Sequence, residues 1–298
     1  KKGFNVLAYR RSAHKMVFEL RRHLAGETLQ LYNQLLEVHE INEFVVPSAE
    51  QLITLHEDIG ELYEERRSKH PKKRFVDFNQ GVDARLLTDE KMRLLSTIPI
   101  RPLRIAFDSM KYARFYERAL RYAAKYGIRH LSNYLLYNFN DEPIDLYRRM
   151  RLNVDLSVEL DLQIYSFPMR YSPIWDDNGL HKSRNYIGPR WNKKFIRAVQ
   201  TVLNATKGKV GTKLSFFNAA FGINEDEFFE ILYMPESYIF NRELFKHNGL
   251  ANSWRSLYHS LSDDERSTVL PIVESNHFEL DSKFTDEKLL TFIDHYKP

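Results

Sequence analysis

The sequence predicts an α/β fold in which a parallel sheet is followed by a mainly helical C-terminal region. Short apolar segments alternate with amphipathic segments of helical period up to about residue 175. The spacing between consecutive apolar segments leaves room for a crossover helix, which favours parallel strands. From about residue 176 onward the strand-like segments disappear while the helical period continues. The expected domains are therefore residues 1–175, with a helical insertion at about 10–73, and residues 176–298.

Five strands are expected from the apolar segments. They cover residues 4–9, 74–79, 103–107, 130–138 and 162–168. Between them, Thr88 is a typical N-cap for a helix reaching about residue 96, and Gly127 is a typical end for a helix over 112–126. Pro143 lies where the first turn of the next helix is expected.

Further helices are expected outside the alternating region. Within the insertion they cover 13–24, 29–39 and the stretch from a capping box at Ser48 to about residue 67. In the C-terminal region they cover 191–204, 225–233, 254–261 and 286–296.

Composition limits the classes of protein that remain. The 298 residues include 44 Lys and Arg, 40 Asp and Glu, and no cysteine. The apolar content is typical of a globular protein, and no apolar run is long enough to cross a membrane, so a cytoplasmic protein is expected. Without cysteine, these residues cannot form disulfides, thiolate nucleophiles or cysteine-ligated iron–sulfur clusters. The chain starts at Lys1 without an initiator Met, which is typical of a partial product.

Polar residues gather where the expected strands end. The densest group surrounds Gly81 and consists of Asp77, Asn79, Gln80, Asp83 and Arg85. The carboxyl ends of parallel strands share one edge of the sheet, which is where ligands bind in α/β folds. A buried Asp–Arg pair that ties a loop to the edge is an equally good interpretation of this group.

Later strand ends carry polar groups as well. Asp108 follows the strand at 103–107 and can either cap the next helix or accept hydrogen bonds from a ligand hydroxyl. Asn138 follows the next strand, and Asp141 is expected to be a helix N-cap. Pro168 and Met169 lie in extended, proline-restrained backbone whose polar groups can border a flat heterocycle.

Two basic runs, at residues 66–74 and 181–197, contain no acidic residue. The second run interleaves aromatic residues with its cations, and Arg190, Lys193 and Lys194 are its candidate contacts to nucleic acid. A solvated surface is the alternative interpretation. The histidines show no metal-ligand spacing, and no nucleophile-elbow or P-loop motif occurs.

Taken together, the strand ends resemble those of radical S-adenosylmethionine (SAM) enzymes. The segment 3–8 resembles the second strand of that family, and DFNQGVDARL at 77–86 resembles the third. RIAFDS at 104–109 is similar to the fourth, NYLLYNFNDEP at 133–143 to the fifth and IYSFPMRYSPI at 164–174 to the sixth. The segments 191–208 and 221–236 look like the C-terminal extension of a radical SAM subgroup.

The resemblance implies a partial (β/α) barrel that lacks its first β/α unit, with SAM and a [4Fe–4S] cluster as the cofactors of the parent enzyme. It would place Asn5 near the SAM amino group, and Asn79, Gln80, Asp83 and Arg85 toward the SAM carboxylate or the substrate. Asp108 would approach the ribose hydroxyls. Asn138 and the backbone of Pro168 and Met169 would border the adenine.

One departure from the family pattern is severe. The CxxxCxxC loop that holds the cluster is missing, so this chain alone is expected to be unable to cleave SAM. Truncation of a parent enzyme is favoured over evolutionary loss. The parent would act on an unknown substrate with an external electron donor.

Two functions of other classes remain open. One is a non-catalytic nucleic-acid- or protein-binding module on a decayed barrel. The other is a cofactor-free hydrolase that uses Asp77, Asp83 and Asp108.

Overall fold

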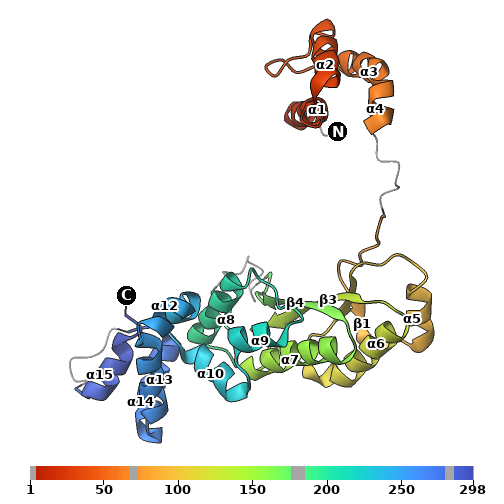
Figure 1. The fold of residues 1–298 in the computed structure, drawn as a ribbon. Coiled ribbons are helices and arrows are strands. Elements are labelled where there is room, and N and C mark those ends of the chain that lie inside the picture. The colour runs from red at the N-terminus through yellow and green to blue at the C-terminus, as the bar shows by residue number, and fades with distance from the viewer. Residues whose placement is uncertain (1–4, 67–72, 176–184, 279–284, 298) are drawn as a thin grey trace. The chain divides into compact units, whose positions relative to one another are not determined.

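Two separate hydrophobic cores divide the chain into the units Lys1–Lys73 and Arg74–Pro298. The computed structural model describes residues 5–66, 73–175, 185–278 and 285–297 (Figure 1). The first unit is helical in its described part, and the second contains a parallel sheet and further helices. The expected domain boundary at residue 175 does not separate the two hydrophobic cores. They are separated at about residue 73, where the expected helical insertion ends.

The N-terminal unit consists of helices around a small apolar core. Their bounds are α1 Val6–Arg21, α2 Gly26–Val38, α3 Ala49–Asp58 and α4 Gly60–Arg66. The expected capping box is confirmed, since the Ser48 hydroxyl accepts from the Gln51 backbone and the Gln51 side chain accepts from the Ser48 backbone. Tyr32 is buried in the core and its hydroxyl donates to the Val17 carbonyl at 2.9 Å. Burial raises the pKa of Tyr32 to about 12.

The strand expected at residues 4–9 was wrong. Asn5 is the N-cap of α1, where its side chain accepts a hydrogen bond from the Ala8 backbone at 3.0 Å. The buried residues of α1, Ala13 and Val17, lie four residues apart, which is the spacing of one helix face. The helical spacing of buried residues therefore determines the structure of this segment. The short apolar run predicted as a strand forms the exposed first turn of α1.

The second unit is built on a four-stranded parallel sheet in the order β1-β2-β3-β4. The strands are β1 Val82–Asp83, β2 Leu103–Ala106, β3 His130–Tyr137 and β4 Gln163–Arg170. The helices that follow the first three strands are α5 Asp89–Leu95, α6 Ala113–Lys125 and α7 Pro143–Glu159, with short 3₁₀ turns η1 Ala84–Leu86 and η2 Met110–Tyr112. The mixed α/β class predicted from the alternating pattern is therefore confirmed.

The predicted strand at 74–79 is also wrong in extent. Residues 73–80 are exposed, and only Val76 forms an isolated bridge, to Ile100. The chain turns at Asn79 and Gln80 and enters β1 after Gly81, whose φ of +81° favours glycine. A strand needs a partner or a buried face along its length, and this segment has neither over most of its residues.

The two faces of the sheet differ. Leu103, Ile105 and Phe107 alternate toward the face that packs under the helices, where the Phe107 and Tyr116 rings stack at 4.2 Å. The opposite face carries half-exposed side chains, among them Arg104 and Tyr134, whose guanidinium and ring lie 5.2 Å apart. This alternation leaves one face for the core and one face accessible within the described part of the unit.

The remaining described helices extend the same core. They are α8 Lys193–Ala205, α9 Leu214–Phe221, α10 Glu225–Tyr233, α11 Glu236–Phe240, α12 Arg242–His247, α13 Leu250–Ser260, α14 Asp263–Ser275 and α15 Glu287–Asp294. Tyr147 of α7 contacts the rings of Phe217 and Phe228, so α7 links the sheet to α9 and α10. The C-terminal helices therefore share the core of the sheet.

Lys194 is a buried cation in this helical region. Its ammonium group donates to the Met234 carbonyl at 2.6 Å and to the Glu236 carboxylate at 3.1 Å, and its side chain is fully buried. Burial lowers the pKa of Lys194 to about 8, although the Glu236 carboxylate opposes this shift.

This burial predicts a specific pH dependence of stability. The pKa of Lys194 is lower in the folded than in the unfolded chain, so between about pH 8 and 10.5 the unfolded chain binds more protons. The unfolding free energy of the wild type should therefore rise by about 2 kcal/mol relative to Lys194→Met between pH 7 and 9.5.

Urea unfolding followed by tryptophan fluorescence measures this difference, because Trp191 and Trp254 are buried in the same unit. Lys193→Met, which removes an exposed lysine from the same helix, is the matched control. Parallel stability curves for the wild type and Lys194→Met would contradict the assignment.

Candidate ligand-binding site at the carboxyl edge of the sheet

A pocket of about 470 Å³ opens at the carboxyl ends of β2 and β3, beside the starts of η2 and α7. The side chains that define its chemistry are Asp108, Lys111, Tyr112, Phe139, Asp141 and Arg149. We call it the strand-end pocket. Its position agrees with the expectation that polar strand ends gather at one edge of the sheet.

Arg149 of α7 fixes the floor of the pocket. Its side chain is fully buried and donates to the carbonyl of Asp108 at 3.2 Å and the carbonyl of Leu136 at 2.8 Å. It also donates to the Asp141 carboxylate at 3.1 Å. One guanidinium thus joins the ends of β2 and β3 to the loop before α7, which gives the pocket a defined backbone frame.

Asp108 places an exposed carboxylate at the pocket. The residue is open to solvent, yet the protein atoms around its carboxyl group desolvate it and raise its pKa above the usual range. The Arg149 guanidinium opposes this shift, and the Asp83 carboxylate adds to it. An ionised Asp108 is an acceptor for two hydroxyl groups, the arrangement expected of a contact to a vicinal diol.

Two half-exposed aromatic rings flank the pocket. Tyr112 is 36% exposed and Phe139 is 42% exposed. The Phe139 ring contacts Tyr171 with centroids 4.7 Å apart, and the Tyr112 ring lies under the Arg85 guanidinium at 4.7 Å. Aromatic surface next to a hydroxyl-binding carboxylate suits a ligand that joins a flat heterocycle to a polyol.

Asp83 and Arg85 form a pair with each other. The Arg85 guanidinium donates to Asp83 Oδ2 at 2.6 Å and to Asp83 Oδ1 at 3.0 Å. These hydrogen bonds hold the pKa of Asp83 below its usual range. The sequence left open a ligand-binding group or a buried Asp–Arg pair at these residues. The contacts show an Asp–Arg pair, which is exposed rather than buried.

Asp77, Asn79 and Gln80 lie away from the strand-end pocket. Asp77 is ion-paired with Arg104 through two hydrogen bonds of 2.9 and 3.1 Å. Asn79 and Gln80 occupy the exposed turn before β1. Asp77 and Asp83 are each paired with an arginine, although the charge of Asp83 still acts on Asp108. The cofactor-free hydrolase therefore stays an alternative interpretation.

Asn138 organises the backbone next to the pocket. It is fully buried with φ of +68°, and its amide donates to the carbonyls of Tyr171 and Tyr186 while its oxygen accepts from Gly188. Its side chain is therefore committed to three backbone groups. These contacts give Asn138 a positioning role, and its expected place beside adenine stays a prediction.

The other expected contacts lie at separate places. Pro168 and Met169 are inside β4, which extends to Arg170, and Met169 is 49% exposed on the face of the sheet that carries Arg104. Asn5 caps α1 in the N-terminal unit.

The described part of the basic run at 181–197 divides its cations between the surface and the core. Residues 181–184 lie outside the described residues, as does most of the run at 66–74. Arg190 pairs with Glu142, and Lys193 is exposed. Lys194 cannot be a surface contact, because it faces the core and is held by Met234 and Glu236.

Sequence reasoning missed Arg149, which is central to the pocket. Its signal was present in the helical period of α7, where Leu146, Met150 and Asn153 share its buried side. An arginine at a buried helical position requires several acceptors nearby, and strand-end carbonyls supply them.

No protein-family model, curated protein or solved structure matches this chain. Within the described ranges, no helix combines the length and apolarity required to cross a membrane.

The close approach of Gly188 to Asn138 allows a test of the packing at the carboxyl edge of the sheet. A β-carbon at Gly188 would lie 2.5 Å from the Phe139 carbonyl oxygen, whereas one at Gly211 would meet only the Tyr165 ring at 4.0 Å. Gly188→Ala should therefore lower the unfolding free energy by about 1–3 kcal/mol, as overpacking does. Gly211→Ala is the matched control and should change it by less than about 1 kcal/mol. Urea unfolding of both variants measures the difference, and equal stabilities would contradict the packing described.

Proposed function

We propose that the strand-end pocket binds the adenosine half of S-adenosylmethionine, and that the chain is part of a radical SAM-type protein acting on a substrate still to be identified. The observation that carries the proposal is the placement of Asp108 beside exposed aromatic surface at the carboxyl edge of a parallel sheet. The resemblance of the strand ends to that family supports the same ligand.

In this proposal the four strands are an arc of a partial (β/α) barrel. Successive parallel strands in chain order, joined by helices, are the repeating unit of such barrels. The face that carries Arg104, Tyr134 and Met169 would then face the barrel interior. Its half-exposed polar and aromatic side chains are compatible with a ligand-facing surface.

In the proposed complex, separate residues would contact the ribose and the adenine of SAM. Asp108 would accept the ribose hydroxyls, while Tyr112 and Phe139 would contact the adenine. The chain contains no cysteine, so none of its residues can supply the thiolate ligands of an iron–sulfur cluster. We therefore assign only the adenosine contacts to this chain and no step of SAM cleavage.

Removal of the Asp108 carboxylate tests the ribose contact. A hydrogen bond to a charged group contributes about 1.5–3 kcal/mol, so Asp108→Asn should weaken the binding of SAM and of adenosine by roughly ten- to a hundredfold. Isothermal titration calorimetry with SAM, S-adenosylhomocysteine and adenosine provides the measurement.

Asp161→Asn serves as the control, since its carboxylate is 97% exposed beyond the end of α7. Equal affinities of the wild type and Asp108→Asn would show that the ribose assignment is wrong. If the wild type binds none of the three ligands at millimolar concentration, the proposed function fails.

The same contact predicts a pH dependence. Desolvation raises the pKa of Asp108, so its carboxylate is protonated at a higher pH than an ordinary aspartate. As the pH is lowered, the adenosine affinity of the wild type should therefore begin to fall at a higher pH than an ordinary aspartate would give, because a protonated carboxyl accepts more weakly from hydroxyl groups. Asp108→Asn should lack this decrease. Calorimetry over a pH series measures it, and identical pH profiles would contradict the role of the carboxylate.

A further inference from the structure

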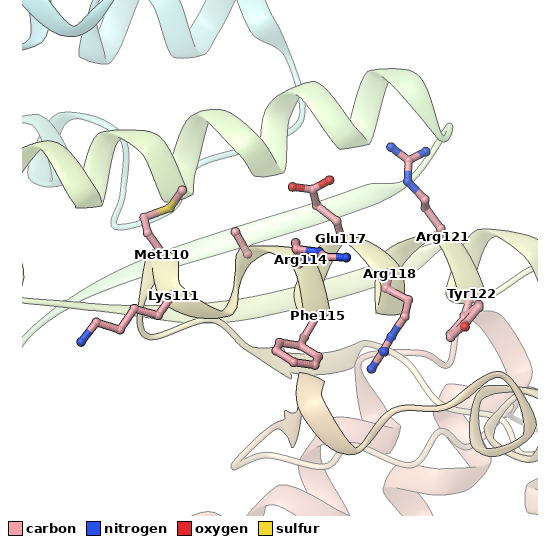
Figure 2. Close-up of a pocket in the computed structure, with 9 residues that line it drawn as sticks. Met110, Lys111, Arg114, Phe115, Glu117, Arg118, Arg121 and Tyr122 are labelled. Carbon is pink, nitrogen blue, oxygen red and sulfur yellow. The ribbon is translucent and has the colours of Figure 1, made fainter.

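The outward face of α6 carries positively charged side chains next to an exposed aromatic ring. An open groove of about 830 Å³ runs along this helix and is lined by residues of η2 and α6 alone. Lys111, Phe115 and Arg118 extend from the same side of the helix (Figure 2), and Arg114 also lines the groove. We call this surface the α6 face.

The cations of the α6 face are available to a partner. Arg121 interacts with both acids nearby, Glu159 through a short ion pair and Glu117 through its charge. Lys111, Arg114 and Arg118 are exposed and form no ion pair among the described residues. Four cations and two acids therefore leave a net charge of two on this surface, and three of the cations have no ion-pair partner among the described residues.

Phe115 gives the α6 face an aromatic element. Its ring is 39% exposed, and the Arg118 guanidinium lies 5.2 Å from the ring centroid. This contact fixes the Arg118 side chain beside the ring, which reduces the conformational freedom it would lose on binding. A cation held next to an exposed ring can contact a phosphate while the ring stacks on the adjacent base.

We propose that the α6 face binds a single-stranded nucleic acid. The cations at Lys111, Arg114 and Arg118 recur at intervals of three and four residues, so they form a row along the helix that matches a run of backbone phosphates. An anionic membrane is a poorer partner, because an interfacial helix inserts its apolar face into lipid. The apolar face of α6, with Tyr116, Ala119 and Leu120, is buried in the protein core.

The test uses the full chain and a fluorescein-labelled single-stranded RNA 12-mer of mixed sequence, with binding followed by fluorescence anisotropy from 50 to 250 mM KCl. Three phosphate contacts on a single strand predict a slope of about −2.1 for log K against log salt. Arg114→Gln with Arg118→Gln should reduce this slope to about −0.7 and weaken binding at least tenfold at 100 mM salt. Neither arginine lines the strand-end pocket, so SAM binding should be unchanged.

Two further variants separate charge from stacking. Phe115→Ala should weaken binding roughly tenfold without changing the salt slope, because stacking releases no counterions. Lys213→Gln with Lys246→Gln removes two exposed cations from the C-terminal helices and should leave both quantities unchanged. All substituted side chains are exposed, so circular dichroism should report the same fold for every variant.

Several outcomes would overturn the proposal. These are no RNA binding by the wild type at 50 mM salt, equal slopes for the wild type and the double arginine variant, or tighter binding of a DNA duplex than of the single strand. Binding to phosphatidylserine vesicles without binding to RNA would likewise overturn it. Similar affinity for the single-stranded DNA of the same sequence would support it, since phosphates and a stacked base are present in both.

Discussion

The carboxyl edge of the sheet depends on one buried guanidinium. Arg149 joins the carbonyls of Asp108 and Leu136 to the Asp141 carboxylate, and no part of its side chain is exposed. Burial of an arginine is costly unless its donors are satisfied, and loss of any acceptor would leave a buried charge without a partner. The geometry of both strand ends is therefore set by where these acceptors must lie. Arg149 holds Asp108 through its backbone carbonyl, and the Asp108 carboxylate takes no part in that hydrogen bond.

Strands and helices were predicted correctly where the apolar residues keep one spacing over the whole segment. The strands at 103–107, 130–138 and 162–168 and the helices between them follow from alternating apolar segments, and β2, β3 and β4 occupy those places. The predictions failed where a short local pattern was read alone. At residues 4–9 the apolar run was brief, and the cap at Asn5 with the buried Ala13 and Val17 shows that a longer helical period governs it.

The candidate site could be predicted in its location and only partly in its residues. Parallel topology brings strand ends to one edge, so the position of Asp108 followed from the order of segments. Which polar groups stay free at that edge depends on side-chain pairing, which no pattern in one sequence reveals. Arg85 pairs with Asp83, and Asn138 is used by the backbone around Gly188. The burial of Lys194 was not predicted either, although the helical spacing of Phe195, Ala198 and Val202 places Lys194 close to the buried side of α8.

These pairings determine how a nucleoside-containing cofactor could be held by this chain. The Arg85 guanidinium already donates to both oxygens of Asp83, so a ligand carboxylate would have to displace an existing carboxylate to reach it. Such an exchange replaces one charge-assisted contact with another and adds little net affinity. No hydrogen bond occupies the Asp108 carboxylate within the described ranges, since Arg149 donates to its carbonyl and attracts the carboxylate only through its charge. In the proposed complex, the affinity for SAM would therefore come from the ribose and adenine contacts, and the amino-acid end of SAM would contribute little through the side chains described.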